Sequence, residues 1–520
     1  MLPDGLPAGR VTLQHERGAM SRKPRAGRGT GLVPQRAFGQ VERVYDPVQV
    51  LSADQVQAIH AAALTVLARQ GMRVLDARAR GFYAAAGGVV EGETVRLDPD
   101  LVMELLGSVP GRFSLAARNP AKSLRFGGND CVFTSVGGPA YVMDIDKGRR
   151  DGTFAEMCDF LKVVQGLNVI HQEGGGPFEP LDLAPNTRHL DIYLAQITLL
   201  DKSWQTQTLG LQRTMDGIEM AALMFGVPVD HLPCSLVGII NTNSPLQLDI
   251  PMAEGLIAMA SAGQVNVITP FTLSGAMAPV TIAGALVLQH AEALAGIVLT
   301  QIVKRGVPVM YGGFTSNVDM RSGAPAFGTP EYAKAAMASG QLARLIGVPF
   351  RSSNVTAANA VDAQAAYESQ MALWGAVMGG AHLIEHGAGW MHGGLTASFE
   401  KLILDAEMLQ MMQSWLEPIK TDTDSLGLAA IADVGAGGHF FGTAHTMSRY
   451  ETAFHQPMLS NWDNYPQWVE KGSVELPQRA NAVWKQVLAE YEQPALDEAV
   501  AEALGDYVAR RKREGGAPMN

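Results

Sequence analysis

The sequence predicts a (β/α)8 barrel with an N-terminal cap of helix and hairpin and with additional C-terminal helices. Helical stretches alternate regularly with short β-type runs from about residue 153 onward, which favours parallel strands joined by helices. Eight such runs can be counted, and most end in polar or small residues, as barrel strands do where they reach an active site. The length of 520 residues suits one large barrel with additions.

The first 40 residues are expected to form a disordered basic arm. They are rich in Gly and Pro and contain a basic cluster, SRKPRAGRGT at Ser21–Thr30. A partner-binding role for this arm stays open. The rest of the chain is more acidic than the formal net charge of -11, which argues against nucleic acid as the main ligand.

Residues 41–152 are predicted to form the cap. The stretch from Ser52, a residue type suited to an N-cap, repeats apolar side chains at helical spacing and stops at Gly71, so a helix of about five turns is expected. The cap should end in a hairpin, because CVFTSVGGPAYVMDIDKGRRDGT contains two strand-like runs that are separated by Gly137-Gly138-Pro139.

The barrel is assigned to residues 153–475 and two C-terminal helices to residues 476–520. The eight predicted barrel strands begin at Leu167, Ser203, Ser235, Val265, Val307, Val348, Ala381 and Gly437. A doubly wound sheet stays possible, since strand count does not fix strand order. However, no G-x-G-x-x-G motif follows a first strand.

Composition indicates a soluble, cytoplasmic protein without a disulfide framework. The three cysteines are far apart and form no C-x-x-C motif. The most apolar long segment, VTIAGALVLQHAEALAGIVLTQIV, contains two Gln, one His and one Glu, which favours a buried core helix over a membrane span. The N-terminus shows no apolar stretch typical of a signal peptide.

Polar side chains close several predicted strands. In AHLIEHGAG, from Ala381, His382 and His386 share one face of the strand, and we expect His382 to be structural and His386 to reach a pocket. The first predicted strand ends similarly, in His171-Gln172-Glu173. The candidate catalytic residues are therefore His386, Glu385, His171 and Glu173.

Aromatic side chains cluster near the same strand ends. A group of rings can hold a quaternary ammonium by cation–π attraction without a charged partner. Polar residues nearby could anchor a second group of the substrate. The candidate substrate-binding residues are Tyr311, Trp204, Phe271, Trp390, Asn241, Arg351 and Asn354.

A metal site is the main alternative chemistry. Imidazole and carboxylate groups suit zinc or manganese, and the histidines and acids at strand ends could supply them. The set that could do so is His171, Glu173, His386 and His439. Barrel hydrolases instead carry H-x-H on the first strand, so no metal ligand is assigned. Nucleophilic catalysis is disfavoured because no G-x-S-x-G motif is present.

Three long segments resemble the trimethylamine methyltransferase family of corrinoid-dependent methyltransferases. They are Gly137–Thr153, Asp362–Leu409 and Gly437–Trp468, within a resemblance that runs from about Tyr45 to Lys512. The resemblance implies a (β/α)8 barrel that passes a methyl group from a methylamine to Co(I) of a separate corrinoid protein. It implies no tightly bound cofactor, because the partner supplies the corrinoid. A homo-oligomer is expected, with no nucleic-acid or membrane partner.

One difference from the founding members of this family changes the expected substrate. Those members use pyrrolysine to bind trimethylamine, whereas the matching stretch SSNVTAANAVDAQAAYE contains ordinary residues, with the replacement expected between Asn354 and Asp362. Members without pyrrolysine resemble glycine betaine methyltransferases. A quaternary ammonium already carries a neutral amine as leaving group, so its demethylation needs alignment more than acid–base help. Demethylation of a glycine betaine-like amine is therefore predicted.

The predicted roles follow from strand-end position and residue type. The aromatic candidates would surround the ammonium, Glu173 and Glu385 would orient neighbouring groups or face the ammonium, and four polar residues could anchor a carboxylate. Those four are His386, His171, Asn241 and Arg351. Three alternatives stay open: a metal-dependent barrel hydrolase, a methyltransferase that uses trimethylamine, and a betaine-binding protein without catalysis.

Overall fold

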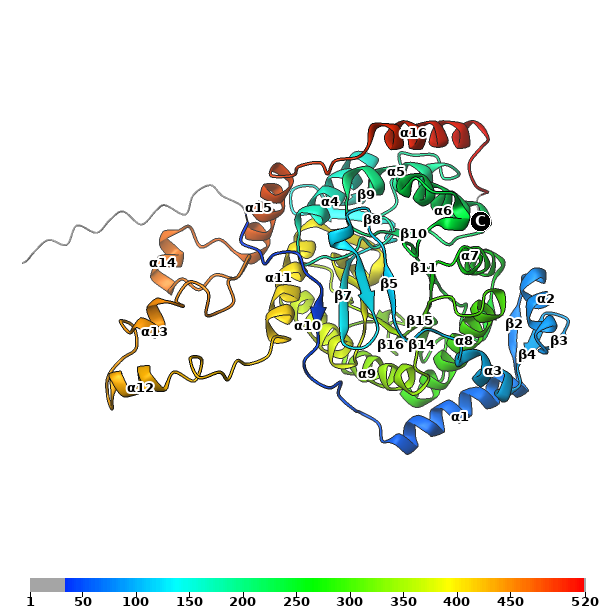
Figure 1. The fold of residues 1–520 in the computed structure, drawn as a ribbon, viewed down its shortest axis with the longest axis horizontal. Coiled ribbons are helices and arrows are strands. Elements are labelled where there is room, and N and C mark those ends of the chain that lie inside the picture. The colour runs from blue at the N-terminus through cyan, green and yellow to red at the C-terminus, as the bar shows by residue number, and fades with distance from the viewer. Residues whose placement is uncertain (1–32, 519–520) are drawn as a thin grey trace, which may run out of the picture.

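The computed structural model describes residues 33–518. Most of them form a parallel (β/α)8 barrel, with a cap on one side and a projecting arm, residues 417–475, on the other (Figure 1). Seven barrel positions are occupied by regular strands. These are β7 (Asp130–Ser135), β10 (Gln205–Thr206), β11 (Val237–Ile240), β13 (Val265–Ile268), β15 (Val309–Gly312), β18 (Phe350–Ser353) and β19 (Leu383–Ala388). Their order in the sheet is β7-β19-β18-β15-β13-β11-β10, with every pair parallel.

The eighth position is occupied by the segment around Gln172. This residue forms single parallel bridges with Thr134 on β7 and with Ser203 just before β10. These bridges join the two ends of the sheet and close it. The predicted barrel is thereby confirmed, and a doubly wound sheet is excluded because such a sheet is open.

One barrel strand lies elsewhere in the chain than the sequence pattern predicts. The run that begins at Gly437 forms no strand but a turn-rich link between α12 (Leu428–Val434) and α13 (Ala444–Met447). Its place is taken by β7, which the pattern assigned to a cap hairpin and which pairs in parallel with β19. A short apolar run has the same appearance in a hairpin and in a barrel, so its partner cannot be read from the sequence.

Helices cover the outside of the barrel. They are α4 (Phe154–Gly166), α5 (Arg188–Leu199), α6 (Leu211–Phe225), α7 (Ile250–Ser261), α8 (Ile282–Val303), α9 (Pro330–Leu345), α10 (Ala363–Met378) and α11 (Phe399–Trp415). Several begin at side-chain caps, such as Thr153 before α4, which forms a capping box with Glu156. Asp362 caps α10 by accepting hydrogen bonds from the backbone N–H groups of Gln364 and Ala365.

Helix α8 is the one helix of the described chain that is long and apolar enough to cross a membrane. It is mostly buried and packs against α1 (Ala53–Arg69), α3 (Pro99–Leu106) and the barrel strands. Its polar residues are satisfied inside the protein: Gln289 donates to Ser339 Oγ, and Glu292 accepts from the backbone N–H of Leu246. The expectation of a buried core helix is therefore confirmed.

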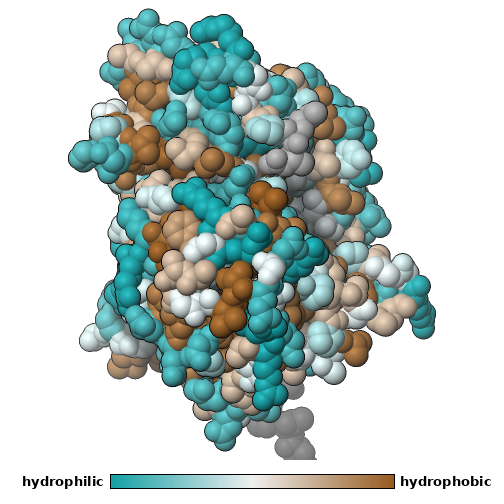
Figure 2. Space-filling model, turned by 90° about the vertical axis from the view of Figure 1, so that its right-hand side faces the viewer, coloured by the Kyte–Doolittle hydropathy of each residue, from teal (hydrophilic) through white to brown (hydrophobic). Residues whose placement is uncertain are grey.

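The cap begins with α1, whose N-cap Ser52 forms a capping box with Gln55. Gly71 ends this helix with a φ of +73°, a conformation that glycine adopts without strain. The other cap elements are β2 (Met72–Val74), α2 (Ala77–Ala85), β3 (Val89–Glu91), β4 (Thr94–Arg96), α3, β5 (Phe113–Leu115) and β6 (Leu124–Phe126). On the face that carries α2 and α7, apolar side chains are scattered among hydrophilic ones (Figure 2).

Short strands extend the barrel beyond its carboxyl end. They are β8 (Tyr141–Asp144), β9 (Gly148–Asp151), β14 (Phe271–Ser274), β16 (Phe314–Val318), β17 (Pro325–Ala326), β20 (Trp390–Met391) and β21 (Thr396–Ser398), whereas β12 (Gln247–Leu248) joins the cap sheet by pairing with β2. Among them β14 pairs with β16, with Phe271 opposite Phe314. At the N-terminal side, β1 (Val41–Glu42) pairs with β7 in the antiparallel sense.

The two ends of the described chain pack on the barrel. Residues 33–40 are ordered against it, in contrast to the predicted disorder, because Val33 is buried and the Gln35 side chain donates to the Gly166 carbonyl. The basic cluster Ser21–Thr30 lies outside the described residues. The two predicted C-terminal helices are confirmed as α15 (Leu476–Ala489), which packs on α11 and α4, and α16 (Glu498–Arg513), which packs on α5 and α6.

Candidate active site

A cavity of about 420 Å³ lies at the carboxyl end of the barrel. All eight barrel positions contribute to its wall, either with a strand residue or with the loop that follows. One wall residue from each barrel position, in sequence order, is Gly137, Gly174, Gln205, Asn241, Thr269, Phe314, Arg351 and Glu385. Barrel enzymes place their active sites at this end, so the cavity is the candidate active site.

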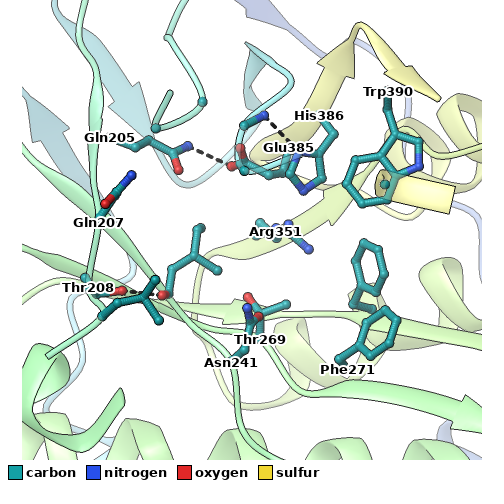
Figure 3. Close-up of a pocket in the computed structure, with 18 of the residues that line it drawn as sticks. Gln205, Gln207, Thr208, Asn241, Thr269, Phe271, Arg351, Glu385, His386 and Trp390 are labelled. Atoms are coloured by element: carbon teal, nitrogen blue, oxygen red, sulfur yellow. Dashed lines mark hydrogen bonds between the residues drawn. The ribbon is translucent and has the colours of Figure 1, made fainter. Parts of the chain in front are cut away.

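The cavity brings together six of the eleven predicted site residues, as Figure 3 shows. They are Asn241, Phe271, Arg351, Glu385, His386 and Trp390. The other five lie outside its wall. They are His171, Glu173, Trp204, Tyr311 and Asn354.

Three aromatic rings form one side of the cavity. Phe271 and Phe314 lie side by side, with ring centroids 5.2 Å apart, and Trp390 lies 6.3 Å from Phe314. Phe327 packs behind them against Phe314 and Trp390. Rings arranged in this way attract a cation to their faces.

Arg351 lies between this aromatic side and the amide-rich side formed by Gln205 and Gln207 (Figure 3). Its side chain is buried, with the guanidinium carbon 5.3 Å from the centroid of the Phe314 ring. Its Nε and Nη1 atoms have no hydrogen-bond partner within residues 33–518. Because a guanidinium keeps its charge in proteins and a buried unpaired donor is unfavourable, this group is suited to receive an anionic ligand.

Glu385 places a buried carboxyl group in the same wall. Its carboxylate accepts hydrogen bonds from Gln205 Nε2 at 2.7 Å and from Thr134 Oγ1 at 3.1 Å. Burial raises the pKa of Glu385, and nearby Arg351 offsets this only in part. Glu385 and Arg351 both line the cavity, and they lie near enough for the guanidinium to favour the ionised carboxylate.

His386 connects the charged and aromatic sides. Its φ of +53° lies in the left-handed region, which is rare for residues other than glycine, and its N–H donates to Thr134 Oγ1. The imidazole lies against Trp390, with ring centroids 4.3 Å apart. Burial lowers the pKa of His386 well below 6.5, so the ring is neutral at pH 7 and does not repel a cation.

Three predicted residues point away from the cavity into packed regions. Tyr311 accepts a hydrogen bond from Gln289 on α8, and Trp204 packs on Tyr193 of α5. His171 accepts from the Phe133 N–H and donates to the Gly39 carbonyl, and burial lowers its pKa to about 3. Because strand side chains alternate between two sides, residue type and strand-end position did not predict which side each one takes.

Two other predicted residues shape the loops around the cavity. Glu173 accepts hydrogen bonds from the N–H groups of Gly175 and Gly176, and burial raises its pKa to about 7. Asn354 donates from Nδ2 to the Gly387 carbonyl, next to His386. Both residues bind the backbone that lines the cavity, and neither side chain is part of the cavity wall.

Some residues of the wall were not among the predicted site residues. Phe314 was one, although it follows β15 in the motif YGGF, in which two glycines precede the ring. Paired glycines contribute backbone at Gly137, Gly174 and Gly393, where runs of glycine after a strand were the available signal. Met252 and Ile239 carry no such signal, because apolar residues of this kind are common in any core.

The possible metal ligands are not brought together. His439 belongs to the projecting arm, while His171 and Glu173 lie outside the cavity wall that contains His386. In residues 33–518 no group of three or more His, Cys, Asp or Glu side chains is placed to hold a metal ion.

Comparisons with known proteins show the family to which the chain is related. Residues 16–516 match the model of a family described as trimethylamine methyltransferase (MTTB). The chain is 37% identical over 470 residues to a glycine betaine methyltransferase of Desulfitobacterium hafniense strain Y51, a match that covers 90% of this chain and 98% of that protein. It is 27% identical over 474 residues to the trimethylamine methyltransferase MttB of D. hafniense strain DSM 10664 / DCB-2, covering 89% and 94%.

Solved structures give a weaker likeness. The crystal structure of the hydroxylamine MtmB complex is 10% identical, with a TM-score of 0.48, and the match covers 89% of this chain and 96% of that one.

Proposed function

This chain belongs to the trimethylamine methyltransferase family, and we propose that it removes a methyl group from a betaine, a quaternary amine that also carries a carboxylate. Its relatives are methyltransferases, and so is this protein. The relative at 37% identity is named for glycine betaine, whereas the MttB relative at 27% identity is named for trimethylamine. The side chains that line the cavity support glycine betaine rather than trimethylamine as the substrate.

The unpaired guanidinium beside the aromatic rings carries the proposal. A betaine would place its trimethylammonium group against Phe271, Phe314 and Trp390, and its carboxylate would accept hydrogen bonds from Arg351. Trimethylamine has no carboxylate and would leave the guanidinium unpaired, at a cost of about 1–3 kcal/mol or more.

The electrostatics of the other cavity residues suit the same substrate. Glu385 adds carboxyl oxygens to the wall, which favour the ammonium end, while neutral His386 adds no repulsion. The amine that leaves a quaternary ammonium is neutral and requires no proton. The chain's residues therefore need only hold one N-methyl group toward the mouth and exclude water, which the aromatic rings and buried charges can do.

The methyl acceptor would come from outside this chain. Co(I) of a reduced corrinoid, carried by a separate protein, would supply the nucleophile. A corrinoid is several times larger than the cavity of about 420 Å³, so the cavity can hold the methyl donor but not the corrinoid. The corrinoid would therefore approach the donor at the mouth of the cavity. The cytoplasm stays the expected location.

The test measures methyl transfer from a matched panel of amines. The purified full chain is mixed with chemically reduced cobalamin, and formation of methyl-Co(III) is followed by absorbance. The panel compares glycine betaine with tetramethylammonium and choline, which lack the carboxylate, and with trimethylamine. We expect glycine betaine or a related betaine to give the highest kcat/KM.

Each competing function predicts a different result. A preference for trimethylamine, or transfer from no amine at all, would contradict the proposal. A metal-dependent hydrolase would lose its activity to a chelator. A binding protein without catalysis would show a betaine-dependent rise in Tm with no methyl transfer.

A further inference from the structure

The segment between α11 and α15 projects from the body of the protein. Residues 417–475, termed the arm below, contain α12, α13 and α14 (Tyr465–Glu470) and extend beside α11 and α15 (Figure 1). The arm touches the body again at Met458 and Leu459, whose N–H groups donate to Glu407 on α11. One of the three segments that resemble the family, Gly437–Trp468, falls within this arm.

The arm cannot hold its structure by itself. Its helices have 7, 4 and 6 residues, and none of these residues is buried. Helices this short are unstable in water unless they pack against another surface. A covering surface is therefore required.

The arm exposes enough apolar area for a stable interface. Six of its aromatic side chains are between 44% and 84% exposed: Phe440, Phe441, Tyr450, Phe454, Trp462 and Tyr465. At about 200 Å² for each fully exposed ring, they present roughly 800 Å². A standard protein interface buries about that area on each partner.

A second apolar surface lies at the root of the arm. Tyr367 and Met371 are one turn apart on α10 and are 61% and 42% exposed, and Met411 and Trp415 are one turn apart on α11 and are 45% and 37% exposed. Tyr45 continues this surface, with its ring 4.9 Å from that of Trp415. These five side chains form the flank patch.

We propose that two copies of this chain associate by placing the arm of each copy on the flank patch of the other. Both surfaces are apolar and exposed in the same chain, which is the requirement for a self-complementary two-fold interface. Because the patch adjoins the root of the arm at Trp415, an axis near this point brings each arm over the partner's patch.

The arm begins at the end of α11, away from the candidate active site. In a (β/α)8 barrel the helices run antiparallel to the strands, so the end of α11 lies at the amino end of the barrel. The candidate active site lies at the opposite, carboxyl end, where a methyl acceptor must approach. The arm ends at α15, whose Asn481 contacts Glu400 in the first turn of α11, so the exposed apolar area and the matching flank patch, and not the position of the arm, favour a second copy of the chain.

The test compares the mass of the full chain with that of three double variants at micromolar concentration, by sedimentation velocity. The arm variant is Phe441→Asp with Phe454→Asp, the flank variant is Tyr367→Asp with Met371→Asp, and the control is Val89→Asp with Met103→Asp, at exposed apolar positions of the cap. We expect wild type and control to be dimers or larger even assemblies, and the arm and flank variants to be monomers with an unchanged circular dichroism spectrum.

A mixing experiment separates reciprocal exchange from other modes of association. In an equimolar mixture of the two monomeric variants, the intact arm of the flank variant can still bind the intact patch of the arm variant. A heterodimer with weakened affinity should therefore form. A monomeric wild type, a flank variant that assembles like wild type, or a mixture without heterodimer would overturn the proposal. None of these results depends on the substrate.

Discussion

Replacement of Arg351 by Met tests the assignment of the carboxylate anchor. The guanidinium lines the cavity and its Nη1 has no partner in the described chain, so Nη1 and the neighbouring Nη2 could donate two parallel hydrogen bonds to one carboxylate. A hydrogen bond to a charged group contributes about 1.5 kcal/mol at the lower end of its range, so two contribute about 3 kcal/mol. This corresponds to a loss of roughly 150-fold in kcat/KM for a betaine.

The same replacement should leave stability almost unchanged. Arg351 makes no hydrogen bond through Nε or Nη1 within residues 33–518, and Glu385 keeps its donors Gln205 and Thr134 in the variant. Arg43 provides a matched control, because it is also buried but donates to the carbonyls of Ala381 and Gly128. Arg43→Met should therefore lower the free energy of unfolding by about 1–3 kcal/mol.

The assay compares glycine betaine with tetramethylammonium in the methyl-Co(III) measurement, together with Tm. Arg351→Met should reduce turnover of glycine betaine strongly and that of tetramethylammonium little, because the latter has no carboxylate to anchor. An equal loss for both amines, or a fall in Tm as large as that of Arg43→Met, would refute the reasoning. The first result would make Arg351 a general structural residue.

Three further predictions concern the surroundings of the cavity. His386→Asn should slow turnover at unchanged Tm, because Asn tolerates a φ of +53°. His386→Val should slow turnover and also lower stability by about 1–3 kcal/mol in thermal unfolding, because a β-branched residue is strained at this φ. Equal Tm values for the two variants would show that the backbone relaxes. The pKa of Glu173 is raised from 4.5 to about 7, so the stability that its protonated form contributes should be lost as pH rises from about 4.5 to about 7. Denaturant titrations of wild type and Glu173→Gln measure this, because the difference between their free energies of unfolding should change across that pH range. A constant difference would contradict the prediction. Asp405→Ala leaves the buried Lys401 ammonium without its carboxylate and should lower the free energy of unfolding by about 3–5 kcal/mol in the same titration. Adding Lys401→Met to this variant should restore part of the lost stability. No recovery in the double variant would argue against the ion pair.

The barrel could be predicted because its signals are local. The alternation of strands and helices, the cap at Ser52 and the apolar pattern of α8 depend on neighbours in sequence, and the structure confirms each of them. The identity of one strand could not be predicted in this way. Strand β7 and the run at Gly437 differ in their partners, and a partner more than 200 residues away, such as β19, leaves no mark on the strand itself.

The candidate site was predicted in part for a similar reason. Glu385, His386 and Arg351 were selected as polar residues at strand ends, and they line the cavity. Tyr311 was selected by the same rule, yet its hydroxyl bonds to α8 while Phe314, three residues later, reaches the cavity. Side chains alternate between the two sides of a strand, and the first residue of each strand sets which side is which.

The sequence by itself determined the fold class, the resemblance to the trimethylamine methyltransferase family and the absence of a pyrrolysine in the matching stretch. These depend on residue types and on local periodicity. Only the tertiary structure decided that an unpaired guanidinium lies beside three aromatic rings, and that the family-like segment Gly437–Trp468 stands in an exposed arm. Both facts are relations between segments far apart in the chain, and packing alone establishes which atoms are left without a partner.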